Sequence, residues 1–291
     1  MIRSRRGVSL VEMLIAMVVS AGVGLAMMAL LTGSTRFEER AEAQRAARLV
    51  SRAGISVITS ELRMVDPSWG VEAETTTSIT VKTPYALGIV CDTTGLMTMM
   101  FLPVDSLALN AAGFSGMAWR ATSGTYHPIS GGTLTTTFTA PSACPSANFP
   151  AITAPTSIPN QKSVYATISG TVRDGIAKGA VVVLYRRTKF YFASSTQTGL
   201  TSRTALWRSH LDASAGAGDA TELVAPFNST AAFQFYSVGS ATPSSTVPAT
   251  LSDTRGLLIY LPGQSENTAR TRSTPEESDL TTSVYFFNSS S

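Results

Sequence analysis

Glu12 is the residue whose position suggests the most specific chemistry in this chain. It is the one charged residue between Arg6 and Arg36, and the residues around it are mostly apolar. A carboxylate within a membrane-spanning segment costs about 2.5–3.5 kcal/mol, so a nearby cation has to compensate for it. Arginines precede the apolar run, and a cleavage before Val8 would add a cationic amine. The sequence therefore predicts a charge pairing for Glu12.

The element that carries Glu12 is predicted to be a membrane-spanning helix. Val8 to Leu31 contains 24 residues, which as a helix extend about 36 Å and exceed a hydrocarbon core of roughly 30 Å. Three arginines precede this run, whereas the charges just beyond it cancel. The positive-inside rule places the amino terminus in the cytoplasm and the rest of the chain outside. A secretory signal peptide cut around 22–26 is the alternative, and it leaves Glu12 unexplained.

The residues around Glu12 resemble a known processing signal. Arg5-Arg6-Gly7 is followed by Val8-Ser9-Leu10-Val11-Glu12-Met13-Leu14-Ile15-Ala16, and this run is similar to the class III signal of type IV pilins and pseudopilins. In that family a prepilin peptidase cuts after the glycine on the cytoplasmic side of the membrane, and the new first residue is N-methylated. The resemblance implies cleavage after Gly7 and methylation of Val8, although the family usually starts with Phe or Met.

The resemblance also implies an assembly role for Glu12. In a filament, Glu12 of an incoming subunit would pair with the Val8 amine of a subunit already in place. A low dielectric strengthens such a pair, and loss of one partner leaves an uncompensated buried charge. The alternative is a glutamate near the lipid headgroups that snorkels toward water. The implied partners are other minor and major pilins, the prepilin peptidase and the inner-membrane assembly platform.

Composition favours an exported protein. Without the three leader arginines, the 22 basic residues become 19 and equal the 19 acidic ones. No global basic field then attracts nucleic acid, which is not an expected partner. Charged residues make up 14% of the chain, which suits an extracellular β-rich domain better than a cytoplasmic enzyme. Cys91 and Cys144 are predicted to form a disulfide in an oxidising compartment, with two buried free thiols as the alternative.

The helix is predicted to continue beyond the membrane to Val65. Good helix formers dominate the run that starts at Phe37, and Ile55, Ile58, Leu62 and Val65 form one apolar stripe. Asp66-Pro67 ends the helix, because a residue before proline is pushed out of the helical region. The predicted divisions are a leader (1–7), a transmembrane half (8–32), an amphipathic half (33–66) and a β-rich head (67–291).

The head is predicted to be a mainly antiparallel sheet, which makes the fold class α+β. A loop-rich insertion at about 103–162 is expected to contain some strand and to be tied down by Cys144, and the segments 211–220 and 264–278 look like a linker and a polar tail. Strand candidates rich in β-branched and aromatic residues are 78–82, 96–102, 164–168, 180–187, 189–193, 205–209, 232–237, 256–261 and 282–287.

A second, weaker resemblance covers about 165–288. Val181 to Arg187, Thr204 to Ser209 and Glu222 to Tyr236 are similar to the carboxy-terminal half of PilW-type minor pilins and of the related J-type minor pseudopilins of type II secretion. The final segment 282–288 resembles the last strand of these proteins. The region 66–160 matches no family pattern.

No catalytic constellation is apparent, so no enzyme activity and no cofactor are predicted. His127 and His210 are 83 residues apart without a neighbouring cysteine, and surface or structural roles are expected for both. The segment 212–219 lacks the acidic density of a calcium loop. Arg186, Arg187, Lys189 and Arg203 form a basic group, for which a solvated strand edge is expected. The aromatics Trp69, Trp119, Tyr126, Trp207 and Tyr236 are expected mainly to pack.

The sequence therefore predicts a minor pilin with a long anchoring helix and a bulky head. Such a subunit would wait in the bacterial inner membrane with its head in the periplasm, and then move to a cell-surface type IV pilus near the tip, where it helps to initiate assembly. Three alternatives stay open: a minor pseudopilin of type II secretion, a competence-pilus subunit or tip adhesin, and a membrane-anchored enzyme, which would need a buried polar cluster in the head that the sequence does not indicate.

Overall fold

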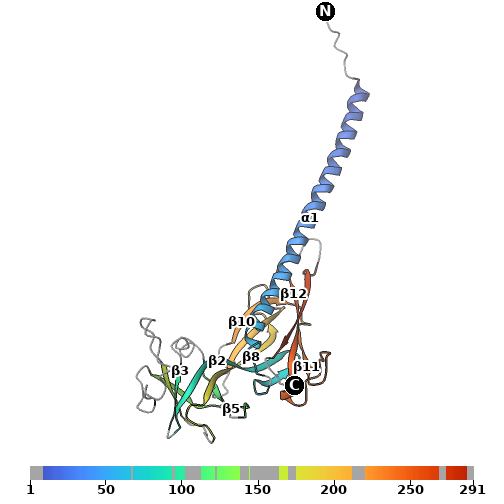
Figure 1. Cartoon of the computed structure of the whole chain (residues 1–291). Coiled ribbons are helices and arrows are strands. Elements are labelled where there is room, and N and C mark those ends of the chain that lie inside the picture. The colour runs from blue at the N-terminus through green and yellow to red at the C-terminus, as the bar shows by residue number, and fades with distance from the viewer. Residues whose placement is uncertain are drawn as a thin grey trace, which may run out of the picture.

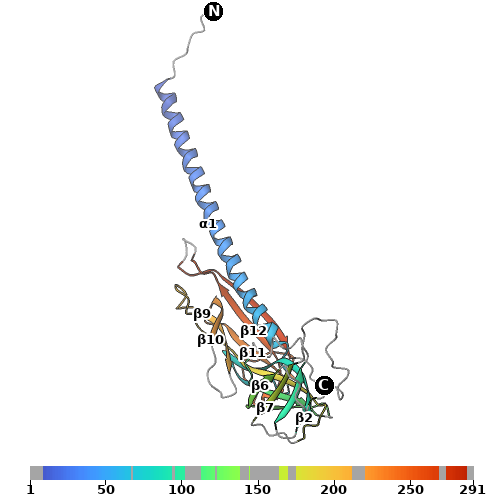
Figure 2. The same ribbon diagram turned by 90° about the vertical axis from the view of Figure 1, so that its left-hand side faces the viewer.

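The computed structural model describes residues 9–66, 68–93, 96–101, 113–121, 123–137, 144, 164–169, 175–211, 220–268 and 273–286. One helix, α1 (Leu10–Leu62), spans 53 residues without a break. Figures 1 and 2 show that its first half projects free of the head and its second half lies against the sheet. The prediction of a long helix that carries an antiparallel β head, an α+β fold, is confirmed.

The end of α1 differs slightly from its predicted boundary. The helix stops at Leu62 rather than Val65, and the Arg63 N–H donates to the Thr59 carbonyl as the last turn closes. The predicted apolar stripe is correct, because Ile58, Leu62 and Val65 are all fully buried. Burial therefore continues three residues past the end of the helix.

Every strand pairing in the described part of the sheet is antiparallel. The strands are β1 (Val71–Thr75), β2 (Ser78–Asp92), β3 (Met97–Phe101), β4 (Gly116–Arg120), β5 (Tyr126–Ser130), β6 (Thr133–Thr137), β7 (Val164–Ser169), β8 (Val181–Ser194), β9 (Thr204–Leu211), β10 (Ala220–Phe227), β11 (Ala232–Ser237), β12 (Thr254–Gln264) and β13 (Glu277–Tyr285), and a short 3-10 turn η4 (Leu251–Asp253) precedes β12.

Several strand predictions need correction. The predicted break between 187 and 189 is wrong, because Thr188 is fully buried and pairs with His210 inside one continuous β8. Strands β1 and β10 had no predicted counterpart. The expected insertion at 103–162 contains β4, β5 and β6 among its described residues. The polar tail predicted for 264–278 is wrong at its two ends, where Ser265 and Glu276 are buried beside β12 and β13, whereas the residues 266–268 are exposed and polar as predicted.

Two hydrophobic cores lie along one long pair of strands. The proximal lobe packs the end of α1 against the sheet, with Phe190, Phe227, Phe233 and Leu261 fully buried. The distal lobe has a separate core that consists of Ala86, Val90, Met97, Met99, Phe101, Met117, Ala166, Ile168, Ile176, Val182 and Leu184. Strands β2 and β8 contribute to both cores, and their ladder joins the two lobes (Figure 1).

The sheet of the distal lobe is curled. Its strand order is β6-β7-β3-β2-β8-β4-β5, yet Ile129 from β5 and Leu134 from β6 pack against the same core. The two ends of the sheet are joined by Gly131 and Gly132, whose φ angles of 90° and 89° favour glycine. The two terminal strands of this sheet therefore come together around one core.

Candidate functional site

Glu12 lies in the first turn of α1 and is exposed. The helix begins after Ser9, whose carbonyl accepts hydrogen bonds from the N–H groups of Glu12 (3.0 Å) and Met13 (3.1 Å). Ser9 and Glu12 have the spacing of a capping box, but the Ser9 side chain makes no capping hydrogen bond. The carboxylate has no ion pair or hydrogen bond with another described residue. It is therefore available to a second molecule, at a helix end that favours negative charge.

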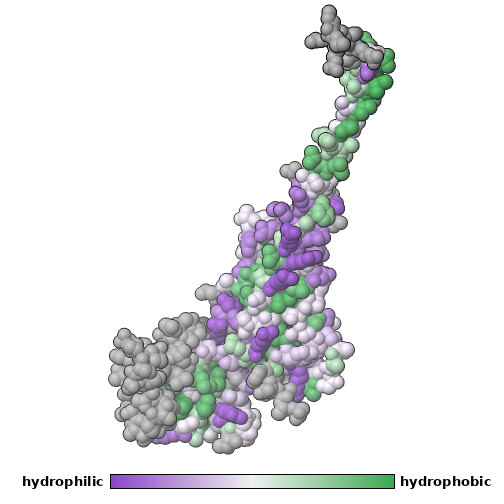
Figure 3. Space-filling view, turned by 45° about the horizontal axis from the view of Figure 1, so that its top comes forward, coloured by the Kyte–Doolittle hydropathy of each residue, from purple (hydrophilic) through white to green (hydrophobic). Residues whose placement is uncertain are grey.

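The apolar half of α1 is exposed along its whole length. The helix is long and apolar enough to cross a membrane, and none of its apolar window is buried by the rest of the described structure. Figure 3 shows this part as a hydrophobic rod, with hydrophilic surface beginning near the head. Large exposed side chains such as Leu25, Leu30 and Leu31 are costly in water, so this half needs lipid or other helices around it. The predicted processing residues Gly7 and Val8 lie outside the described residues.

The second half of α1 is attached to the head through a close contact with β12 and β13. The Ser51 hydroxyl accepts a hydrogen bond from the Gly263 N–H (3.0 Å) and donates one to the Ser278 carbonyl (3.0 Å). Gly263 and Ser278 face each other across the β12–β13 ladder. A Cβ on Gly263 would lie 2.3 Å from the Ala47 carbonyl oxygen, so glycine is what lets the helix approach.

A buried ion-pair cluster fixes the last turn of α1. The Glu61 side chain is 10% exposed and pairs with Arg208 at 2.7 Å and with Arg186 at 3.5 Å. His210 lies on the same strand as Arg208, and burial followed by the two arginine charges lowers its pKa. The Glu61 carboxylate thus pairs with two arginines from the neighbouring strands β8 and β9. Because Glu61 lies in the last turn of α1, these ion pairs form only when this end of the helix is docked against the sheet.

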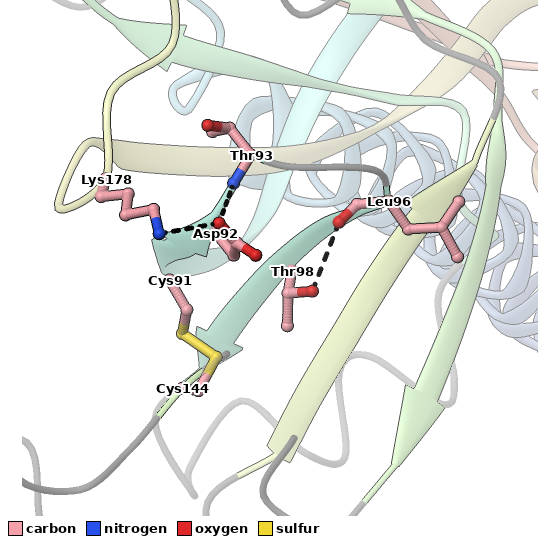
Figure 4. The surroundings of a disulfide bond; sticks show 7 residues. All are labelled: Cys91, Asp92, Thr93, Leu96, Thr98, Cys144 and Lys178. Carbon is pink, nitrogen blue, oxygen red and sulfur yellow. Dashed lines mark hydrogen bonds and ion pairs between the residues drawn. A yellow bond between two sulfur atoms is a disulfide. The ribbon is translucent and has the colours of Figure 1, made fainter. Parts of the chain in front are cut away.

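The predicted disulfide between Cys91 and Cys144 is present, with the two Cα atoms 5.0 Å apart. Both cysteines are buried and pack against Met100 and Tyr165 on the distal lobe. Figure 4 shows the bond at the end of β2, where the neighbouring Asp92 pairs with Lys178 at 2.9 Å. The bond therefore ties residue 144 to the end of a strand that runs through both lobes.

The basic group singled out from the sequence is not assembled into one patch. Arg186 pairs with Glu61, and Arg187 pairs with Glu72 at 2.6 Å. Lys189 lies over the Tyr191 ring at 5.4 Å, and Arg203 donates to the carbonyls of Ser265 and Glu266. The basic group is therefore divided among separate structural contacts.

The aromatic residues and histidines have packing roles. Trp69 is buried with Tyr126 and Tyr185, Trp207 stacks on Tyr191, and Tyr236 lies against Tyr285. Trp119 stacks on His127 at 4.8 Å between ring centroids. In the part of the chain that the structure describes, no group of three or more His, Cys, Asp or Glu side chains could hold a metal ion. The faint calcium loop at 212–219 lies outside the described residues.

Comparison of the chain with protein-family models, with curated proteins and with solved structures finds no significant match. The candidate site is therefore defined by the chain itself: an exposed apolar helix with a carboxylate in its first turn, and a docked second half. Sequence reasoning singled out Glu12 and the two cysteines, but it missed Ser51, Gly263 and Glu61. The small residues Ser51 and Gly54, three apart in a helix, were the available signal for a close helix contact.

Proposed function

We propose that this chain is a structural subunit of a type IV pilin-like filament, a minor pilin that acts near the tip and helps to initiate assembly. The apolar half of α1 anchors it in the inner membrane, and the same half later packs among the helices of other subunits. Glu12 pairs with the methylated amine of Val8 on a neighbouring subunit. The head carries no catalytic role in this proposal.

The observation that supports this proposal most directly is the division of α1 into two different halves. A single helix of 53 residues carries an exposed apolar half and a docked polar half. A cleavable secretory signal does not need to continue as a rigid helix into a folded head. A filament subunit does, because the continuous helix fixes where its head lies relative to the filament. The exposed Glu12 carboxylate adds a charge that a simple lipid anchor would disfavour.

The shape of the head favours a minor subunit over the repeating subunit of a shaft. The head extends sideways into a distal lobe, away from the helix (Figure 1), and such a shape would crowd a regular lattice. A minor pseudopilin of type II secretion has the same physical requirements and stays the second candidate. The basic group 186–203 is engaged within the head, so nucleic-acid binding is not part of the proposal.

The processing step is tested by mass spectrometry of the amino-terminal peptide of the protein isolated from its own membrane. A mature chain that begins at Val8 with the added mass of one methyl group is expected. A chain that starts near Gly22 to Ala26, or that retains Met1, would contradict prepilin processing and remove the basis for the assembly role of Glu12.

The assembly role of Glu12 is tested by Glu12→Val. The variant is expected to insert and to be cleaved normally, but its incorporation into filaments should fall at least about tenfold, because a charge pair in low dielectric is worth several kcal/mol. Met13→Val is the matched control, since it places the same residue in the same helical turn and leaves the carboxylate intact. Normal incorporation of Glu12→Val, measured in sheared filament fractions, would remove the pairing role.

A further inference from the structure

Strand β13 is the last strand of its sheet, and its outer edge is unpaired. It pairs with β12 through nine consecutive residue pairs, from Gly256–Tyr285 to Gln264–Glu277, without a bulge. No second strand pairs with it among the described residues. Nine residues at about 3.4 Å each give an edge about 30 Å long, whereas strands commonly have about five or six residues. The edge of β13 is therefore both long and regular.

The hydrogen bonds at the two ends of the β12–β13 ladder show which backbone groups face outward. The Ser265 N–H donates to the Glu276 carbonyl, and the Phe286 N–H donates to the Arg255 carbonyl. Because antiparallel strands exchange hydrogen bonds at every second pair, the even-numbered residues of β13 face β12. The odd-numbered residues face outward: Glu277, Asp279, Thr281, Ser283 and Tyr285. In the part of the chain that the structure describes, the N–H and C=O groups of these five have no hydrogen-bond partner.

The strand on the other side of β12 is protected, whereas β13 is not. On β11, the Phe233 N–H donates to the Thr76 carbonyl, and Phe235 exchanges two hydrogen bonds with Ser244. Strand β13 contains no proline, glycine, lysine or bulge, and its only charges are two acids at one end. Proline, lysine and bulges are the usual means of blocking an edge, and an unblocked edge is a template for a further strand. The edge of β13 is therefore a docking position for an added strand.

A second copy of this chain does not fit the edge in either direction. Strand β13 runs in the same direction as α1, because it starts with Ser278 beside Ser51 and ends with Val284 in the core under the end of the helix. Antiparallel pairing of two β13 strands would point the two helices in opposite directions, so they could not be anchored in one membrane. Parallel pairing would bring Glu277 and Asp279 close to the same acids of the other copy, and facing like charges are destabilising. The fitting occupant is therefore another polypeptide.

The side chains of β13 indicate the chemistry of that polypeptide. Glu277 and Asp279 are exposed, and neither makes an ion pair with another described residue. At the other end of the strand, Tyr285 is 61% exposed and lies against Tyr236, with 5.1 Å between ring centroids. Aromatic residues pair well with β-branched ones across strands, and antiparallel pairing is the more stable kind. An antiparallel strand with β-branched residues and a basic carboxyl end therefore complements this edge.

We infer that the outer edge of β13 binds an extended segment of another exported polypeptide, which adds an antiparallel strand to the sheet. Backbone hydrogen bonds to the five outward residues provide the binding, and a basic carboxyl end beside Glu277 and Asp279 fixes the direction. The inference goes beyond the proposed function, because it assigns a polypeptide ligand to the head. It uses that function only to place the head outside the membrane and to exclude a second copy.

A peptide of matching length tests the inference. The probe is Thr-Val-Thr-Val-Thr-Val-Lys-Thr-Lys, with a dye at its amino end and an amide at its carboxyl end. Fluorescence anisotropy follows its titration with the full-length protein in dodecylmaltoside micelles, and saturable one-to-one binding is expected. N-methylation of the third and fifth peptide residues removes N–H groups that face β13 and should weaken binding at least about tenfold. N-methylation of the fourth and sixth residues, whose N–H groups face away, is the matched control and should change binding less than about twofold.

Two variants of the protein locate the binding on β13. Thr281→Pro removes an outward N–H at the centre of the edge and leaves the ladder to β12 intact, since proline is tolerated at such edge positions. It should weaken peptide binding at least about fivefold, and thermal unfolding checks that the head remains folded. Asp279→Lys should weaken binding about fivefold. A peptide with Glu in place of both Lys residues should bind this variant better than it binds the native chain.

Hydrogen exchange at single residues distinguishes an added strand from binding elsewhere. The N–H groups of Asp279, Thr281 and Ser283 should exchange freely in the protein alone and become protected with the peptide, whereas those of Leu280 and Thr282 are protected in both states. Absence of saturable binding, unchanged exchange at the three outward residues, or equal effects of the two N-methylated peptides would overturn the inference. Efficient self cross-linking of Thr281→Cys would also overturn it, because a second copy would then occupy the edge.

These outcomes are distinguishable from failure of the proposed function. The titration in micelles requires neither prepilin processing nor a filament. Peptide binding at β13 by a chain that is never cleaved after Gly7 would support this inference and contradict the pilin proposal. A processed chain that enters filaments but does not bind the peptide would do the reverse.

Discussion

Gly263 is the single residue on which the docking of α1 depends most directly. The missing side chain lets the Ser51 hydroxyl reach between two facing backbone groups of β12 and β13. The obstacles to a Cβ there include the backbone oxygen of Ala47, at 2.3 Å. Backbone atoms cannot move aside as a flexible side chain can, so even one methyl group has to displace the helix from the sheet.

Gly263→Ala is therefore expected to lower the free energy of unfolding by about 2–3 kcal/mol through overpacking and loss of the Ser51 hydrogen bonds. Gly33→Ala is the matched control, because a Cβ at Gly33 meets nothing within 4 Å. That control should leave stability unchanged or raise it by up to about 1 kcal/mol through helix propensity. Urea unfolding of both variants in detergent measures the difference, and equal stabilities would contradict the proposed close contact.

Glu74 gives the head a dependence on pH. Burial raises the pKa of this carboxyl to about 7, against a smaller opposing effect of its hydrogen bond from Thr254. Because the folded state favours the protonated form of Glu74, protonation of this carboxyl stabilises the fold. That stabilisation is complete below about pH 4.5 and is lost as the pH rises to about 7. The free energy of unfolding should fall by up to about 3 kcal/mol over this window.

Glu74→Gln should flatten this part of the stability profile and should be more stable than the native chain at pH 8. Glu222→Gln is the contrasting variant: burial raises the pKa of Glu222, but hydrogen bonds from Ser195 and Thr196 outweigh it and lower the pKa. The stabilisation by Glu222 is present above about pH 4.5 and is lost as the pH falls below it. Chemical denaturation at several pH values checks both signs, and a Glu74→Gln profile parallel to the native one would contradict the assignment.

Residues that violate a local rule could be found from the sequence, and residues that act through tertiary contacts could not. Glu12 is conspicuous because a charge interrupts an apolar run, and two cysteines in an exported chain suggest a bond. Ser51 is an ordinary helix residue, and its role depends on a glycine 212 positions away. Glu61 looks like one more surface charge until two arginines of β8 and β9 converge on it.

At the scale of elements, the spacing of apolar residues along the chain predicted the helix and those strands whose pattern is local. The helix and its apolar stripe follow from the 3.6-residue repeat, and the alternating strands β11 and β12 follow from the two-residue repeat. Strand β8 was divided in error because its polar middle, Arg186 to Lys189, contributes side chains to ion pairs, ring contacts and a buried threonine. Strands β4, β5 and β6 are five residues each, and β4 begins with Gly116, β5 contains Pro128 and β6 is mostly Thr, so their pairing partners define them more than their composition does.

At the scale of the whole molecule, the two lobes are expected to differ in how they respond to reduction. The bond Cys91–Cys144 closes a loop in the distal lobe with a sequence separation of 53. By restricting the unfolded chain it contributes about 4 kcal/mol, and none of its contacts reach the core under α1. Reduction should therefore destabilise the distal lobe first.

Hydrogen exchange of the oxidised and reduced protein tests this expectation. Amides of β3 and β7 should exchange faster after reduction, whereas those of β11 and β12 should keep their protection. Cys91→Ala with Cys144→Ala should reproduce the reduced pattern and serves as the control for the reductant itself. Uniform loss of protection in both lobes would mean that the head unfolds as one cooperative unit.

The shared ladder of β2 and β8 has a mechanical consequence. Eleven residue pairs join these strands, from Ser78–Tyr191 to Ile89–Val181, and both strands run from one core to the other. A pull on the distal lobe against an anchored helix is therefore carried along two continuous backbones and not across a noncovalent interface. We therefore expect the connection between the two lobes to withstand tension at least as well as each lobe does.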